Sequence, residues 1–452
     1  MIEKNNSLII SASGVRGIVG EGLVPEIVVG LAAAFGEIRK GKILVGYDTR
    51  TSNEMFKYAV ISALLSTGCE VVDLGICPTP SVQLMVRKSE ANGGVVITGS
   101  HNPAEWNALK FVRSDGLFLF PEEGEELVKV YRERRIKWSR WNGIGKVYRD
   151  DTAVEYHIDR IVELVDVDKI KDKKFKVVID ACNGAGSVIS PVLLERLGCK
   201  TFKINCNTSG YFPHLPEPIP DNLQQLCRAV KDYEADIGFA HDIDADRLAL
   251  VVEGGRAISE EYTLALVTKF VLQKSPGLVV TNVCTSQMID DIAEQFNCPV
   301  KRTRVGDIYV SRCMMDCGAV IGGEGNGGVI FPLINYARDG VMALALLLNY
   351  MAEEKEPISS IVDKLPRYYR FKNKVKSYKV NLDKLREDLL KRFSSNRVDF
   401  TDGVKIWFNE GWVHMRKSGT EPVVRIIGEA KDPEDAEKLS NWALNFIDEF
   451  SY

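Results

Sequence analysis

The segment LLSTGCEVVD, residues 64–73, changes from a helical apolar pattern to a strand within a few residues. A glycine stands where the helix ends, a position that often needs a positive φ angle, and a cysteine leads into the strand. The same order of features occurs in LERLGCKTF at 194–202 and in AEQFNCPV at 293–300, where asparagine replaces the glycine. Each segment follows an apolar strand, a polar loop and an amphipathic helix. The sequence therefore predicts three related βαβ units of the α/β class.

The C-terminal part of the sequence has a different pattern. From about Arg370, strand-like alternation surrounds two helical segments, which predicts a separate and largely antiparallel α+β domain. The expected strands span 371–380, 404–408, 413–415 and 423–427, and the expected helices span 382–393 and 433–450. Residues 363–369 form the expected linker. We therefore expect four domains, at residues 1–150, 151–254, 255–366 and 367–452.

The composition is that of an ordinary soluble globular protein, with 45% apolar and 27% charged residues. No run approaches the roughly 18 apolar residues that cross a bilayer, and no signal peptide is recognisable, so we expect a cytoplasmic protein without a membrane partner. The longest apolar run, at 341–348, predicts a buried helix. Ten scattered cysteines without a C-x-x-C pair are expected to be mostly core thiols. A net charge of −4 without a long basic run argues against nucleic acid as a partner.

Four loops carry residues suited to chemistry, and the first is TGSHNP at 98–103. Asn102 and Pro103 indicate a turn, which would expose the hydroxyl group of Ser100 at the end of an apolar strand. The G-x-S-x-G elbow of serine hydrolases is absent, because Asn102 stands where its last glycine is needed. Taken alone, the loop is either a polar surface turn or the site of an oxygen nucleophile.

The second loop, HDIDADR at 241–247, places carboxylates at alternate positions directly before an apolar strand. Asp242, Asp244 and Asp246 would repel one another unless a cation or partner compensates them. An EF-hand is excluded, because Arg247 stands where glycine is required and a strand follows the loop. The loop is either a solvated acidic turn or a site for a hard cation, for which Mg²⁺ is favoured over Ca²⁺.

The third loop is GGEGNGG at 322–328. It contains the G-x-G-x-x-G spacing, but an extended segment follows it in place of the helix that a dinucleotide site needs. Glu324 and Asn326 are suited to hydrogen bonds with neighbouring hydroxyl groups of a polyol. A flexible hairpin turn is the alternative interpretation.

The fourth loop is RKSGTEP at 416–422, between two expected strands. An arginine, two hydroxyl groups and the backbone N–H groups around a glycine form a nest for a phosphate dianion, although a basic surface turn is the alternative. A P-loop at 36–42 is excluded, because its glycine spacing leads into a strand without the required Ser or Thr. Together the four loops indicate phosphoryl transfer on a sugar phosphate, where catalysis depends on positioning and charge neutralisation.

The four loops, in this order, resemble those of the α-D-phosphohexomutase superfamily, which comprises phosphoglucomutases, phosphomannomutases and phosphoglucosamine mutases. The resemblance extends from SGVRG at 13–17 to the Arg416 loop. It implies four domains around a central cleft, three with related α/β mixed sheets and a smaller α+β domain at the C-terminus. It also implies an intramolecular phosphotransferase that interconverts hexose 1-phosphate and hexose 6-phosphate through a phosphoserine and a hexose 1,6-bisphosphate, with one Mg²⁺ per chain.

The resemblance assigns roles to individual residues. The phosphoserine is Ser100, and the Mg²⁺ ligands are Ser100, Asp242, Asp244 and Asp246. The other catalytic positions are Arg16, His101, Lys110 and Arg247, of which His101 and Lys110 are the candidates for proton transfer. The substrate-binding positions are Asn107, Glu324, Asn326, Arg416, Ser418, Gly419, Thr420 and Arg425. The resemblance further implies that the fourth domain moves, and we expect its hinge at residues 366–370.

Several positions depart from the usual family pattern. Many members have Ser where Asn326 stands and His where Gly328 stands, and the form found here resembles that of archaeal members. Ala108 and Ile243 replace usual glycines, and we expect Ile243 to point away from the cation. None of these residues selects among glucosamine, glucose and mannose. These sugars differ at carbon 2, whereas Glu324 and Asn326 would read carbons 3 and 4, so broad specificity is expected.

Two rival functions remain open from the sequence. One is a Mg²⁺-dependent phosphatase, in which water takes the phosphoryl group from the same serine. The other is a non-catalytic sugar-phosphate sensor, against which the intact serine and aspartates argue. In each case the partner is a small hexose phosphate, and a homodimer is left open.

Overall fold

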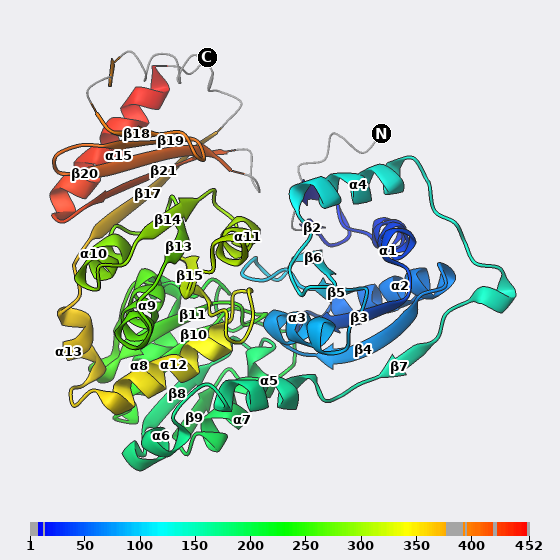
Figure 1. Ribbon diagram of the computed structural model, residues 1–452, viewed down its shortest axis with the longest axis horizontal. Coiled ribbons are helices and arrows are strands. Elements are labelled where there is room, and N and C mark those ends of the chain that lie inside the picture. The colour runs from blue at the N-terminus through cyan, green and yellow to red at the C-terminus, as the bar shows by residue number, and fades with distance from the viewer. Residues whose placement is uncertain (1–7, 12–13, 377–391, 394–395, 419–422, 450–452) are drawn as a thin grey trace.

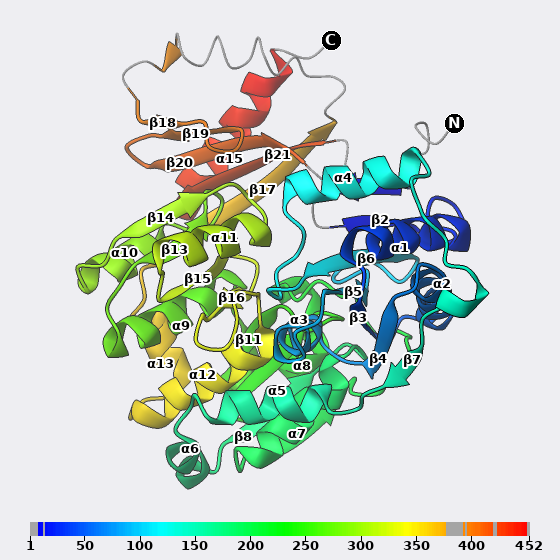
Figure 2. The same ribbon diagram turned by 45° about the vertical axis from the view of Figure 1, so that its right-hand side comes forward.

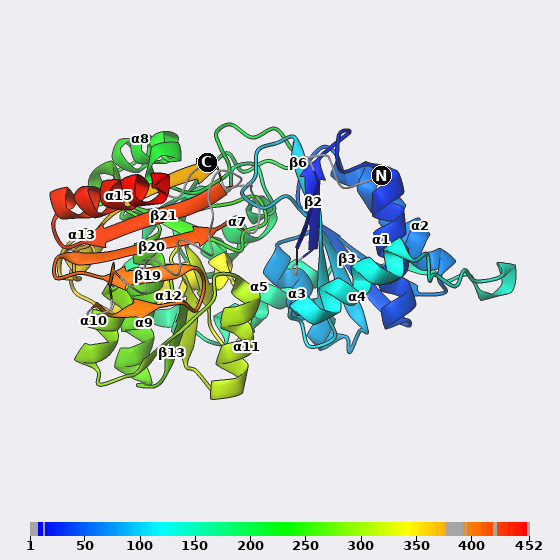
Figure 3. The same ribbon diagram turned by 90° about the horizontal axis from the view of Figure 1, so that it is seen from above.

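Four β-sheets follow one another along the chain, and each forms a unit with its own helices (Figure 1). The computed structural model describes residues 8–11, 14–376, 392–393, 396–418 and 423–449. The first unit lies on one side of the molecule, and the second, third and fourth units are arranged along the other side (Figures 1 and 2). Seen from above, the first sheet and the fourth sheet lie well apart (Figure 3).

The first unit has a seven-stranded sheet in the order β1-β2-β6-β5-β3-β4-β7. Its strands are β1 (Leu8–Ser11), β2 (Gly14–Ile18), β3 (Lys42–Tyr47), β4 (Glu70–Ile76), β5 (Gly93–Ile97), β6 (Trp106–Arg113) and β7 (Val147–Arg149). Its helices are α1 (Pro25–Arg39), α2 (Asn53–Ser66), α3 (Thr79–Lys88), α4 (Pro121–Arg132) and the short η1 (Trp141–Gly143).

The second unit has the strand order β12-β11-β10-β8-β9. Its strands are β8 (Lys176–Asp180), β9 (Lys200–Ile204), β10 (Ile237–His241), β11 (Leu248–Val252) and β12 (Arg256–Ala257). Its helices are α5 (Ala153–Val162), α6 (Val167–Lys173), α7 (Gly186–Arg196), η2 (Pro220–Asn222), α8 (Gln224–Asp232) and η3 (Glu253–Gly255).

The third unit has the strand order β14-β13-β15-β16. Its strands are β13 (Val279–Asn282), β14 (Val300–Thr303), β15 (Ile321–Glu324) and β16 (Gly328–Ile330). Its helices are α9 (Glu261–Lys274), α10 (Met288–Gln295), α11 (Asp307–Cys317), α12 (Gly340–Glu353) and α13 (Ile358–Asp363). In the part of the chain that the structure describes, no helix is long and apolar enough to span a bilayer.

The fourth unit has an antiparallel sheet in the order β17-β21-β20-β19-β18. Its elements are β17 (Tyr369–Lys376), β18 (Val398–Asp399), β19 (Val404–Trp407), β20 (Gly411–Lys417), β21 (Val423–Ala430) and α15 (Pro433–Asp448). The expected helix at 382–393 falls almost entirely outside the described residues. The two-residue strand β18 was not expected, because so short a strand shows no alternation of apolar and polar residues in the sequence. The predicted fold class, three mixed α/β sheets followed by a smaller antiparallel unit, is confirmed.

The three sequence repeats fold alike. The strand pairs β3–β4, β8–β9 and β13–β14 are all parallel, and the helix between each pair is the expected one. The residue two positions after each helix has a positive φ angle, of 84° at Gly68, 72° at Gly198 and 54° at Asn297. The glycines and the asparagine are therefore used for the backbone conformation that ends the helix.

Each repeat also contains a hairpin that the sequence did not reveal as a common feature. The strand orders β4-β3-β5-β6, β9-β8-β10-β11 and β14-β13-β15-β16 are the same order in three sheets. In each sheet the last two strands are antiparallel and consecutive in the chain. The Ser100 loop, the aspartate loop and the glycine-rich loop connect these three strand pairs. Three of the four candidate loops thus occupy the same place in three copies of one topology.

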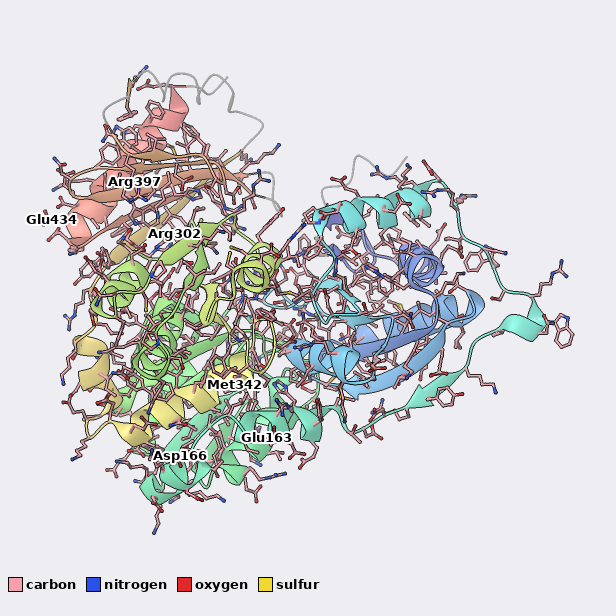
Figure 4. All side chains as sticks on the ribbon, in the orientation of Figure 1. Glu163, Asp166, Arg302, Met342, Arg397 and Glu434 are labelled. Carbon is pink, nitrogen blue, oxygen red and sulfur yellow. The ribbon has the colours of Figure 1, made fainter. Side chains whose placement is uncertain are left out.

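The second and third units share one hydrophobic core. The apolar run at 341–348 lies within α12, as predicted, and is buried throughout. Its side chains, including the labelled Met342 in Figure 4, form one cluster with Val177 of β8 and Val279 of β13. The fourth unit has a separate cluster. All ten cysteines are free thiols: three are buried, and five of the six half-buried ones pack against a hydrophobic cluster, in agreement with the prediction that most lie in the core.

The shared core gives a test of the fold. Leu344 is fully buried in α12, so we expect Leu344→Ala to lower the free energy of unfolding by about 2–5 kcal/mol. Hydrogen exchange should lose protection in β8 and β13 together, while β20 and β21 keep theirs. Val192→Ala, at an exposed position of α7, is the matched control. Loss of protection in the third unit alone would show that the two cores are independent.

Candidate active site

A cavity of about 840 Å³ lies where the four units meet. Every unit contributes polar side chains to its wall, and those from the candidate loops and their neighbours are Arg16, His101, Asn102, Glu217, Arg247, Glu324, Asn326, Arg416 and Arg425. Ser100, Lys110 and the three aspartates are buried, outside the set of lining residues. The structure therefore brings the four loops to one place, as predicted.

Ser100 is held in a left-handed backbone conformation at the end of β5. Its φ angle is 48°, its N–H donates to Thr98 Oγ1 at 2.8 Å, and the amide of Asn102 donates to the carbonyl of Gly99 at 3.1 Å. The predicted turn is confirmed, but the expectation of an exposed hydroxyl is wrong, because Ser100 is only 3% exposed. The aspartate loop of the second unit covers the hydroxyl, which donates to Asp242 Oδ2 at 2.9 Å.

A buried guanidinium group shapes the Ser100 loop. Arg50 donates to the carbonyl oxygens of Ser100 and Asn102 and to two more from the same loop, all at 2.6–2.8 Å. A Cβ at residue 99 would lie 2.6 Å from Cζ of Arg50, so the glycine before the serine makes room for this side chain. Asp48 compensates the charge at 3.3 Å. Sequence reasoning missed Arg50, although a charged D-T-R segment directly after a buried strand was a visible signal.

The three aspartates form a buried acidic cluster. Asp242, Asp244 and Asp246 are at most 1% exposed, and one carboxylate oxygen of each lies within 4.8 Å of the others. Burial, followed by the charges of the other two aspartates, raises the pKa of Asp242 well above its usual range. Ile243, between two of the aspartates, is fully buried as well.

Cationic groups from two other units hold one side of this cluster. Lys110 Nζ donates to Asp244 Oδ2 at 2.7 Å, and Thr79 Oγ1 donates to the same oxygen at 2.6 Å. Arg338 donates to Asp246 Oδ2 at 2.6 Å. Burial would lower the pKa of Lys110, but Asp244 and Asp246 raise it, so the amine is charged. Thr79 and Arg338 were not expected from the sequence.

The remaining oxygens fit a divalent cation. Asp244 Oδ1 and Asp246 Oδ1 are buried and have no hydrogen-bond partner among the described residues. Buried carboxylate oxygens without partners are costly unless a cation binds them. Oxygen-only ligands next to a serine that could carry phosphate are the donor set that Mg²⁺ prefers. The residues present therefore fit the predicted metal.

The glycine-rich loop presents Glu324 at the end of β15. Its Oε1 accepts hydrogen bonds from Asn282 Nδ2 at 2.8 Å and from the amide of Gly306 at 2.9 Å, and its Oε2 accepts one from Arg338 at 2.8 Å. Asn326 lines the cavity beside it. An antiparallel strand follows the loop, which confirms that it is a hairpin and not a dinucleotide site.

Arg16, Arg247 and His101 form the wall above Ser100. Arg16 donates to Asn102 Oδ1 at 3.1 Å, and His101 Nδ1 lies 3.4 Å from Ser100 Oγ. Burial, together with Arg247 and Arg16, lowers the pKa of His101 well below its ordinary value. Asn107 does not line the cavity; it is fully buried and donates to Ser52 and Asn53, so it fixes β6 against α2.

The fourth unit places two arginines on the cavity wall. Arg416 of β20 and Arg425 of β21 are direct partners across the strand pair. Ser418 follows them at the end of β20, whereas Gly419 and Thr420 lie outside the described residues. The unit is fixed to the third by Arg370, which forms an ion pair with Glu261 and donates to the carbonyl of Cys284, while Glu429 of its own sheet forms a second ion pair with it.

Comparison with known proteins supports one family for the whole chain. Models of phosphoglucomutase/phosphomannomutase match domain I at residues 8–136, domain II at 155–255, domain III at 259–369 and the C-terminal domain at 369–441. A phosphoglucomutase/phosphomannomutase of Thermococcus kodakarensis is 41% identical, with 96% of this chain and 97% of that protein covered. A phosphoglucosamine/phosphogalactosamine mutase of Sulfurisphaera tokodaii is 37% identical, with 96% and 97% covered.

A solved structure agrees with these relatives. A phosphoglucomutase/phosphomannomutase family protein of Burkholderia thailandensis superimposes with a TM-score of 0.85 at 27% identity, with 97% of this chain and 96% of that chain covered. All four domains and their order are thus accounted for. The chain belongs to the phosphoglucomutase/phosphomannomutase family of the α-D-phosphohexomutase superfamily.

Proposed function

We propose that the protein interconverts hexose 1-phosphate and hexose 6-phosphate through a phosphoserine at Ser100 and a hexose 1,6-bisphosphate. The observation that carries this proposal is the hydrogen bond of 2.9 Å between Ser100 Oγ and Asp242 Oδ2, beneath a cavity lined by arginines from three units. A serine beside buried acidic ligands and below a cationic pocket is suited to carry a phosphoryl group. The names of the relatives, all sugar-phosphate mutases, support the same activity.

The reaction begins with Ser100 in its phosphorylated form. The free hydroxyl oxygen of the sugar phosphate forms a bond to phosphorus as the bond from phosphorus to Ser100 Oγ breaks, and the hydroxyl proton passes to a protein base. His101 and Lys110 are the two candidates for proton transfer: His101 lines the cavity and can accept the proton, whereas Lys110 lies below it and is charged beside Asp244, so it can act only as a proton donor. The bisphosphate then reorients and returns its other phosphate to Ser100 by the reverse step. Mg²⁺ held by Asp242, Asp244 and Asp246 would neutralise charge on the transferring group.

Other residues bind the sugar phosphate in either orientation. Glu324 and Asn326 accept and donate hydrogen bonds to sugar hydroxyls, while Arg16 and Arg247 face the reacting phosphate. The non-reacting phosphate binds at the fourth unit, to Arg416, Ser418, Gly419, Thr420 and Arg425. Reorientation requires room, so we propose that the fourth unit opens about residues 366–370 and closes to exclude water. The same cavity accepts glucosamine, glucose and mannose phosphates, because it reads hydroxyls that these sugars share.

The proposal predicts that the purified protein isomerises glucosamine 6-phosphate, glucose 1-phosphate or mannose 1-phosphate, with a trace of the 1,6-bisphosphate as activator. Ser100→Ala should lower kcat by about 10³-fold or more, because the phosphoryl carrier is lost. Ser209→Ala, at an exposed serine, is the matched control.

The same assay separates the rival functions. Free phosphate released in place of isomer would favour a phosphatase, and binding without turnover would favour a sensor. Undiminished mutase activity of the Ser100→Ala variant would refute the assignment of the nucleophile.

The acidic cluster gives a second prediction. Burial and the charges of Asp244 and Asp246 disfavour the ionised form of Asp242, so Asp242→Asn should stabilise the metal-free protein. Mg²⁺ should raise the Tm of the unaltered protein, since it binds only the folded state, and should not raise that of the variant. Chelation should abolish mutase activity until Mg²⁺ is restored. A variant that is less stable without metal would contradict the repulsion inferred among the aspartates.

A further inference from the structure

Gly328, where many family members have His, leaves space for one particular side chain. A Cβ at residue 328 would lie 2.3 Å from Cδ and 3.0 Å from Cγ of Arg338. Gly328 is not among the residues with a positive φ angle, so its backbone does not require glycine. The absence of a side chain at this position is therefore explained by Arg338, which fills the space.

Arg338 bridges the glycine-rich loop and the aspartate loop. Its side chain is 9% exposed. Nη1 donates to Glu324 Oε2 at 2.8 Å, and Nη2 donates to Asp246 Oδ2 at 2.6 Å. Asp307 Oδ2, at the start of α11, lies 3.5 Å from Nη2. One guanidinium plane thus contacts a residue of the second unit and two of the third.

The backbone around Arg338 is fixed to the same loops. Asp339 caps α12 by accepting hydrogen bonds from two of its first amides, at 2.9–3.0 Å. The amide of Gly340 donates to the carbonyl of Ala245, in the aspartate loop, at 3.2 Å. A Cβ at residue 340 would lie 2.5 Å from the carbonyl oxygen of Arg247. The segment 338–340 is therefore packed directly against the aspartate loop, and the backbone that carries Arg338 is held in place.

We infer that Arg338 is a positioning residue that orients Glu324 for the sugar hydroxyls and reduces the negative charge of the metal site. This inference rests on the proposed function. Glu324 Oε1 is already held by Asn282 and Gly306. Its Oε2 accepts a bond of 2.8 Å from Arg338 and a longer one of 3.4 Å from Asn326, so Arg338 makes the stronger of the two contacts that fix the plane of the carboxylate. At the other end, the positive charge at Asp246 competes with the cation for the same carboxylate.

These two effects have opposite signs when the side chain is removed. Without Arg338, Glu324 loses the contact that fixes its plane, so the sugar binds more weakly. The acidic cluster loses one positive charge, so a divalent cation binds more tightly. Lysine keeps the charge but cannot reach two acids in one plane, because it lacks the forked donors of arginine. A general loss of folding would weaken the binding of both the sugar and the cation. Weaker sugar binding together with tighter cation binding therefore identifies a positioning role.

The experiment measures KM for the preferred hexose phosphate and, by calorimetry without sugar, Kd for Mg²⁺. For Arg338→Met we expect KM to rise about tenfold and the Kd for Mg²⁺ to fall about three- to tenfold. Arg338→Lys should raise KM while leaving the Kd for Mg²⁺ within about twofold of the unaltered protein. Gly328→Ala, which displaces the arginine without removing it, should raise KM in the same direction. Arg196→Met, at an exposed arginine of α7, is the control.

Two results would overturn the inference. One is an unchanged KM in Arg338→Met, and the other is a weaker Mg²⁺ affinity that accompanies a raised KM and a lowered Tm. Failure of the proposed function is distinguishable, because the unaltered protein would then isomerise no hexose phosphate. In that case the Kd for glucose 1-phosphate, measured by calorimetry, replaces KM. We still expect Arg338→Met to raise this Kd and to lower the Kd for Mg²⁺.

Discussion

The arrangement of the site depends on three carboxylates that are buried within reach of one cation. Such a cluster is unfavourable unless positive charge surrounds it, and the structure supplies that charge from different units. Lys110 comes from the first unit and Arg338 from the third, while Asp244 and Asp246 belong to the second. The ion pairs that compensate the aspartate loop therefore also connect the first three units around it.

A repeated topology explains how the loops reach one another. In each of three sheets the chain turns back after its third parallel strand, and the loop at that turn carries the polar residues. One hairpin holds Ser100, the proposed phosphate carrier, the second holds the aspartates of the proposed metal site, and the third holds Glu324, the proposed sugar-binding carboxylate. The second and third units are further joined by a common core around α12, so two of these hairpins belong to one hydrophobic body. The fourth unit has its own core, and its contacts with the third include the ion pairs of Arg370 with Glu261 and of Lys372 with Glu260.

Much of this was predictable from sequence, because periodicity and local motifs carry it. The three repeats, the buried helix at 341–348 and the aspartate loop all depend on short-range patterns. The partners of the supporting residues were not predictable, because they lie far away in the chain: Arg50 contacts carbonyls about fifty residues away, and Arg338 reaches Asp246 across 92 residues. The burial of Ser100 was also missed, since the cover comes from a loop 142 residues later in the chain. A charged residue after a buried strand is visible in the sequence, but the group that it contacts in the fold is not.

We propose that these hairpins form one phosphoryl-transfer site at Ser100. Peptide mass spectrometry of the protein after incubation with a hexose 1,6-bisphosphate and Mg²⁺ tests this site directly. We expect a single phosphate on the peptide that contains Ser100, which disappears when excess hexose 6-phosphate is added and is absent from the Ser100→Ala variant. An active enzyme that carries no phosphate on Ser100, or carries it on another residue, would show that Ser100 is not the phosphoryl carrier.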